Sequence, residues 1–126
     1  MYELSYTFNF EAAHDLAQSS PAQAQEPGVH AYSRVHGHSF VATVILSAES
    51  LTKDGWVTDI AAVRAACDKT RDALDHRLLN EIEGLETPTL EVIAQWIFDA
   101  LSKDLPALAR IEVARPTLGE RATYRP

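Results

Sequence analysis

The amino-terminal segment contains a strictly alternating pattern that restricts the possible folds more than any other feature of the chain. In ELSYTFNF, residues 3–10, polar or charged residues alternate with Leu4, Tyr6, Phe8 and Phe10. Because successive side chains of a strand point to opposite faces, this pattern predicts a half-buried β-strand with one apolar face. Such a strand needs neighbouring strands and a second layer that covers its apolar face.

Three further segments have the character of strands. SFVATVILSA, residues 39–48, is rich in β-branched and aromatic residues and is apolar on both parities, so both of its faces are expected to be covered. Near the carboxyl end, ARIEVAR at 109–115 and RATYR at 121–125 predict two short closing strands. Residues 15–35 contain two prolines, a glycine and many small polar residues without a steady period, which predicts a long loop.

Two segments have the 3.6-residue period of amphipathic helices. The first follows Thr58 or Asp59 as the capping residue. Its expected buried stripe is Ile60, Val63, Cys67, Thr70 and Leu74. The second follows Thr89 as the cap and is expected to stop before Pro106. Its expected buried stripe is Leu90, Ile93, Ala94, Ile97 and Leu101.

These elements together predict an α+β fold in the order ββααββ. The expected architecture is a four-stranded antiparallel sheet with two helices on one face, formed by one domain over residues 1–126. A chain of this size can bury a core without disulfides, yet a complete active site in so small a chain can require a second subunit.

Composition excludes several classes of function. The formal net charge is −7 and no basic stripe is interleaved with aromatic residues, which argues against nucleic-acid binding. No apolar run approaches the roughly 18 residues of a membrane span. The amino terminus has no signal-peptide pattern, and the single Cys67 cannot form an internal disulfide, so a cytoplasmic location is expected.

Three histidines are the main candidates for chemistry. If the second strand begins near Val35, His36 and His38 share one face and are separated only by Gly37. His14 continues the apolar parity of the first strand, so a hairpin would bring all three imidazoles together. Three histidines without a cysteine are typical of a catalytic zinc site with an open position. The alternative interpretation is that they are unrelated turn or surface histidines.

Five motifs in a fixed order carry a resemblance to a known family: FNFEAAH, RVHGHSF, DGWVTDI, LDHRLLN and TPTLEVIA. They resemble the 6-pyruvoyl-tetrahydropterin synthase family, and more closely its bacterial branch, the 6-carboxytetrahydropterin synthases of queuosine biosynthesis. The resemblance extends from Phe8 to about Val113 and implies a tunnelling fold, or T-fold. It further implies a homo-oligomer, a trimer or a hexamer of two trimers, with active sites at subunit interfaces and Zn²⁺ on His14, His36 and His38.

The resemblance also implies an activity. Family members are lyases that act on 7,8-dihydroneopterin triphosphate, a pterin substrate. Asp75 and His76 match the family pair that moves protons, and Thr89 and Glu91 match positions expected to contact the substrate. Apart from the resemblance, the favoured explanation is that Asp75 caps or pairs at a helix end and that His76 is a partly buried filler.

The departures from the family pattern leave the reaction open. The catalytic cysteine of the bacterial branch falls at Tyr32, and that of the animal branch falls at His30. His30, Tyr32 or Glu26 could replace the thiol as a base, or all three could be ordinary loop residues. Cys67, on the inner stripe of a helix, is expected to be a core residue and not a nucleophile.

A second departure concerns the ring of the substrate. The pterin-binding glutamate of the family is expected near Arg115, and Glu112 and Glu120 lie nearby but out of register. The chain is therefore expected to be a zinc-dependent pterin synthase-like lyase with an altered reaction. The alternatives are a non-catalytic or regulatory pterin or purine binder, and a structural subunit whose histidines bind no metal.

Overall fold

The computed structural model of the 126-residue chain describes residues 1–16 and 33–126. Its elements in chain order are β1 (Tyr2–His14), β2 (His36–Ala48), α2 (Ile60–Leu74), β3 (Arg77–Leu78), the 3₁₀ turn η2 (Leu79–Glu81), α3 (Leu90–Leu101), β4 (Leu108–Arg115), η3 (Pro116–Leu118) and β5 (Glu120–Tyr124). The predicted α+β class and the positions of both helices are confirmed.

The sheet differs from the prediction in one strand. Its order is β3-β1-β2-β4-β5, and β1 and β2 pair in antiparallel register from Tyr2 with Ala48 to His14 with His36. The additional strand, β3, runs parallel to β1 and pairs through two residues only. The predicted four-stranded antiparallel sheet is therefore wrong: the sheet is five-stranded and mixed. A strand of two residues is too short to show a sequence period. Its pairing with β1 depends on where α2 ends, which the local sequence does not indicate.

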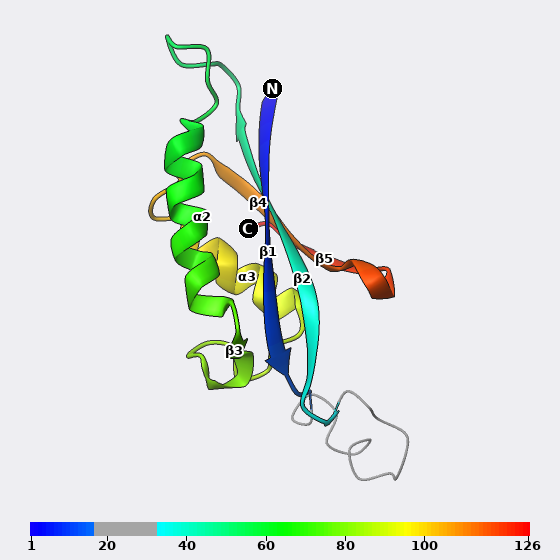
Figure 1. Cartoon of the computed structure of the whole chain (residues 1–126). Helices are drawn as coiled ribbons and strands as arrows, with labels where there is room; N and C mark the ends of the chain where they lie inside the picture. The colour runs from blue at the N-terminus through cyan, green and yellow to red at the C-terminus, as the bar shows by residue number, and fades with distance from the viewer. Residues whose placement is uncertain (17–32) are drawn as a thin grey trace.

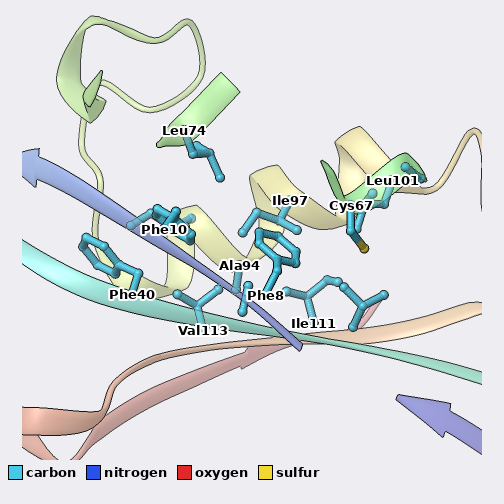
Figure 2. Close-up of a cluster of buried hydrophobic side chains, with 14 of the residues drawn as sticks. Phe8, Phe10, Phe40, Cys67, Leu74, Ala94, Ile97, Leu101, Ile111 and Val113 are labelled. Carbon is cyan, nitrogen blue, oxygen red and sulfur yellow. The ribbon is translucent and has the colours of Figure 1, made fainter. Parts of the chain in front are cut away.

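Both helices cover one face of the sheet (Figure 1). Packing of α2 is mainly against β1, whereas α3 packs against β4 and β5. Figure 2 shows the resulting core, in which Phe8, Phe10 and Phe40 of the strands lie against Leu74 and Ile97 of the helices. Burial of side chains of this size stabilises the fold by about 1.5–3 kcal/mol each.

The helix caps follow the expected chemistry. Asp59, one of the two predicted candidates, caps α2 because its Oδ1 accepts a hydrogen bond from the backbone N–H of Ala61 at 2.9 Å. Thr89 caps α3 and accepts from the backbone N–H of Val92 at 3.3 Å. These side chains satisfy amide groups that have no carbonyl partner in the first helical turn.

The buried stripes are confirmed except at one position. All five predicted residues of α3 are buried, as are four of the five in α2. Ile60 is 38% exposed, which contradicts the prediction. It is the first residue of α2, and helical side chains point toward the amino end, so Ile60 extends beyond the packed layer.

Within residues 1–16 and 33–126, no helix combines the length and apolar character needed to span a membrane.

The carboxyl end of β1, the amino end of β2 and β3 meet at the same end of the sheet (Figure 1). At this end the inner face changes from apolar residues to histidines.

Candidate functional site

Strand pairing brings the three histidines together. In the β1–β2 register, His14 lies opposite His36 and Ala12 lies opposite His38. Directly opposite residues of an antiparallel pair point to the same face, so all three imidazoles share the inner face. Their ring centroids are 4.6 to 5.1 Å apart, and one ligand atom from each lies within 4.8 Å of the others.

Backbone carbonyl groups determine which nitrogen two of these rings present. His14 Nδ1 donates to the carbonyl oxygen of Pro88 at 2.8 Å, and His36 Nδ1 donates to that of Arg34 at 2.6 Å. Since a carbonyl oxygen only accepts, Nδ1 is the donor in both rings, and the neutral tautomer that this hydrogen bond selects presents the lone pair of Nε2. A metal-bound histidine commonly has this second hydrogen bond, which orients the ring.

The buried environment favours the neutral imidazole. Burial lowers the pKa of His14 below its usual value, although the hydrogen bond to Pro88 acts in the opposite direction. Burial, followed by the nearby His14 and Arg115, lowers the pKa of His38 to about 4. Both rings are therefore neutral at neutral pH, and the neutral form is the one that binds a metal ion.

The cluster fits a metal ion. His14 Nε2 is buried and has no hydrogen-bond partner among the described residues. A buried acceptor without a partner is costly, and a metal ion bound by the three nitrogens would satisfy it. Three imidazole donors suit zinc and related transition metals, and they leave a coordination position for water or substrate.

Asp75 and His76 lie beside the same end of β1. Asp75 Oδ1 accepts from the backbone N–H of Glu11 at 2.8 Å, and its Oδ2 accepts from His76 Nδ1 at 2.9 Å. The backbone hydrogen bond from Glu11, followed by that from His76, lowers the pKa of the Asp75 carboxyl. The carboxylate therefore remains ionised at neutral pH and holds the proton of His76 on Nδ1, which leaves Nε2 as the basic atom.

The backbone of His76 is strained. Its φ is 58°, in the left-handed region, and its N–H donates to the carbonyl oxygen of Glu11 at 2.6 Å. Its side chain is 78% exposed, so the interpretation of His76 as a partly buried filler is wrong. Asp75 is indeed the residue at the carboxyl end of α2, as the alternative interpretation expected.

One groove connects the two groups of residues. It has a volume of about 390 Å³, and its lining includes His38 and His76 together with Glu11, Gly37 and Arg77. The pairing of β3 with β1 produces this arrangement, because it places the chain that follows His76 beside Ala12 and Ala13. A ligand in the groove can contact His38 of the histidine cluster and His76 of the Asp75–His76 pair at the same time.

The other residues predicted for the site or considered as its nucleophile remain to be placed. The hydroxyl of Thr89 caps α3, and Glu91 is exposed in the first turn of that helix. His30, Tyr32 and Glu26 lie outside the described residues. Cys67 is buried in the core, as Figure 2 shows, and burial followed by the charge of Asp68 raises the pKa of its thiol to about 11.

Two contributions to the site were missed from the sequence. The Pro88 carbonyl that orients His14 belongs to the backbone and has no residue-type signal. The side chain of Asn80 accepts from the backbone N–H of Asp15 and donates to its carbonyl oxygen, both at 3.0 Å. Asp15 is the residue that directly follows His14. The position of Asn80 in the LDHRLLN segment was the available signal, since an amide side chain can satisfy both backbone groups of one residue.

The fold and this site define an α+β protein with a three-histidine centre suited to a metal ion at one end of its sheet. Residues 3–126 match the family described as 6-pyruvoyl tetrahydropterin synthase. The chain belongs to this family.

Individual relatives agree with this assignment. The chain is 35% identical to the 6-carboxy-5,6,7,8-tetrahydropterin synthase of Synechocystis sp., over 90% of this chain and 85% of the relative. It is 31% identical to the dihydroneopterin monophosphate aldolase of Pyrococcus furiosus, over 85% and 81% of the two chains. The structure of Caenorhabditis elegans 6-pyruvoyl tetrahydropterin synthase is similar with a TM-score of 0.82 and 25% identity, covering 99% of this chain and 95% of the other.

Proposed function

We propose that the protein is a zinc-dependent lyase of the 6-carboxytetrahydropterin synthase type that acts on 7,8-dihydroneopterin triphosphate or a related pterin. The observation that carries the proposal is the groove shared by His38 of the histidine cluster and His76 of the Asp75–His76 pair. The two relatives described above support a pterin substrate, because one is named as a synthase of a tetrahydropterin and the other as an aldolase of dihydroneopterin monophosphate. The name of the second relative supports a phosphorylated dihydroneopterin.

His14, His36 and His38 would hold the zinc ion. Bound zinc supplies Lewis-acid chemistry, polarising hydroxyl groups on the side chain of the substrate. His76 accepts a proton at Nε2, since its Nδ1 proton is held by the Asp75 carboxylate. That carboxylate stabilises the imidazolium that forms, and its anchoring to the Glu11 backbone keeps the pair in place.

A second group must return the proton, and the family's cysteine is absent from the chain at both expected positions. We propose His30 for this role, with Tyr32 and Glu26 as the alternatives in the same segment. Cys67 is excluded because it lies in the core on α2 and its thiol remains protonated at neutral pH.

A non-catalytic pterin or purine binder is the second candidate. It is favoured by Tyr32 and Arg115, which stand where the family resemblance places a cysteine and a pterin-binding glutamate. A binder would use the same groove without moving protons, so the two candidates differ in turnover and not in affinity.

The deciding experiment is incubation of the zinc-loaded protein with 7,8-dihydroneopterin triphosphate and, separately, with the monophosphate. Products are identified by mass, which distinguishes cleavage of the side chain from simple loss of phosphate. Product formation that requires zinc and is lost in His76→Ala supports the lyase. Saturable binding without product after long incubation contradicts it and supports the binder.

We further propose that the protein is a homo-oligomer, a trimer or a hexamer. In the part of the chain that the structure describes, β5 is an edge strand paired only with β4, and the opposite edge is the two-residue β3. A groove of about 400 Å³ at the amino end of β1 is lined in part by Tyr2, Leu51, Trp56 and Ile60, which are 38–50% exposed. Exposed edges and apolar surface of this kind favour association. A monomer by light scattering at micromolar concentration would contradict the proposal.

A further inference from the structure

An arginine occupies the inner face of the sheet where the apolar core ends. On β4, Ile111 and Val113 are fully buried core residues, and Arg115 continues the same parity at the end of the strand. Its side chain is only 11% exposed. Arginine is rarely buried to this extent without partners, because removal of its charge from water is costly.

The partners of this guanidinium are incomplete within the described residues. Arg115 Nη2 forms an ion pair with the carboxylate of Glu120, its opposite residue on β5. Arg115 Nη1 lies 3.5 Å from His38 Nε2, at the outer limit of a hydrogen bond. Arg115 Nε is buried without an acceptor in the described part of the chain. A guanidinium has five N–H donors, so it has spare capacity beside the histidine cluster.

The charge balance at this position favours an anion. Imidazole ligands bind a metal ion in their neutral form and add no charge of their own, so a divalent ion held by the three histidines would keep its full charge. Together with the Arg115 guanidinium, that charge exceeds the single negative charge of Glu120, and Glu120 is itself 38% exposed to screening by water. A positive centre in a partly buried environment attracts an anion strongly.

We propose that Arg115 is an anion-binding residue of this site, and that the natural ligand carries an oxyanion, a phosphate or a carboxylate, held between the metal ion and the guanidinium. The planar fork of arginine can donate two parallel hydrogen bonds to either group. Glu120 positions the fork from the opposite strand and competes with the ligand for it. The inference rests on the proposed function in so far as it assumes a metal ion on the three histidines.

Calorimetric titration of the zinc-loaded protein, freed of excess zinc, with inorganic phosphate and separately with acetate tests the proposal. Arg115→Met should weaken binding of the preferred anion at least about tenfold, since a charge-assisted bidentate contact is lost. Arg110→Met is the matched control, because Arg110 lies on the same strand and pairs with Glu3 at 2.6 Å but belongs to the opposite parity. The control should bind the anion as the parent does, and the relative affinity for the two probes distinguishes a phosphate site from a carboxylate site.

Parent-like anion affinity in a folded Arg115→Met variant overturns the proposal, as does a parent that binds neither anion. If Arg115→Met does not fold, Glu120→Gln decides: it should bind the anion more tightly because the competing carboxylate is gone, and unchanged or weaker binding overturns the proposal. A chain that takes up no zinc refutes the proposed metal site. In that case the same titrations of the metal-free variants decide the role of Arg115 separately.

Discussion

The strained backbone of His76 permits a sharp test that separates its catalytic role from its structural cost. The perturbation is a series of three variants, His76→Ala, His76→Asn and His76→Gly. All three remove the imidazole, and all keep the backbone N–H that donates to Glu11. They differ mainly in how readily the residue adopts the observed φ of 58°.

The magnitude follows from that angle. A residue with a Cβ costs about 1–2 kcal/mol in the left-handed region, and asparagine tolerates this region better than alanine. Glycine has no such cost but loses about 0.5–1 kcal/mol more in conformational entropy on folding. The glycine variant should therefore be more stable than the alanine variant by about 0.5–1 kcal/mol, with the asparagine variant between them.

Urea denaturation of the zinc-loaded variants, followed by circular dichroism, measures these differences in the free energy of unfolding. In parallel, the rate of product formation should fall at least about a hundredfold in all three variants, because a general acid or base is lost. An alanine variant as stable as the glycine variant would refute the assignment of strain at His76. Turnover at the parental rate in any of the three would refute its role in proton transfer.

Three further predictions concern the three-histidine cluster, the core thiol and the end of β1. Zinc content should be about one ion per chain and should be lost in the His36→Ala, His38→Ala double variant; unchanged zinc by metal analysis would exclude the three-histidine site. With a pKa raised from 9.0 to about 11, the Cys67 thiol should react with iodoacetamide at pH 8 about a hundredfold more slowly in the native chain than in the urea-unfolded chain, and equal rates would contradict its burial. Asn80→Ala should cost about 1–2 kcal/mol of stability and weaken zinc binding, because both hydrogen bonds to Asp15 are lost; Asn80→Asp, which keeps only the acceptor, should lie between it and the parent.

Local patterns predicted much of the fold. Thr89 and the five buried residues of α3 could be identified because capping chemistry and the helical period depend only on nearby residues. The grouping of His14 with His36 and His38 followed from extending two strand parities to the point where the strands meet. The prediction for Ile60 was wrong because this residue follows the helical period but lies at the amino end of α2, before the buried stripe that begins at Val63.

The features that were missed depend on contacts between distant segments. The pairing of β3 with β1 involves two residues of each strand, and the acceptor for His14 is a backbone carbonyl that any residue could supply. The ion pair of Arg115 with Glu120 requires the β4–β5 register, which is set by the turn at Pro116–Leu118 and by Gly119 with its φ of 67°. None of these has a period or a composition that can be read from one segment.

The hydrogen bond between His14 and the Pro88 carbonyl has a consequence for the order of events during synthesis. It joins residues that are 74 positions apart in the sequence. A nascent chain that ends before Pro88 can pair β1 with β2, but it lacks the acceptor that orients the His14 ring. In the proposed zinc site, tight capture of the ion would therefore follow the docking of the segment that leads into α3. Metal retention by the newly made protein would then report that this long-range contact has formed.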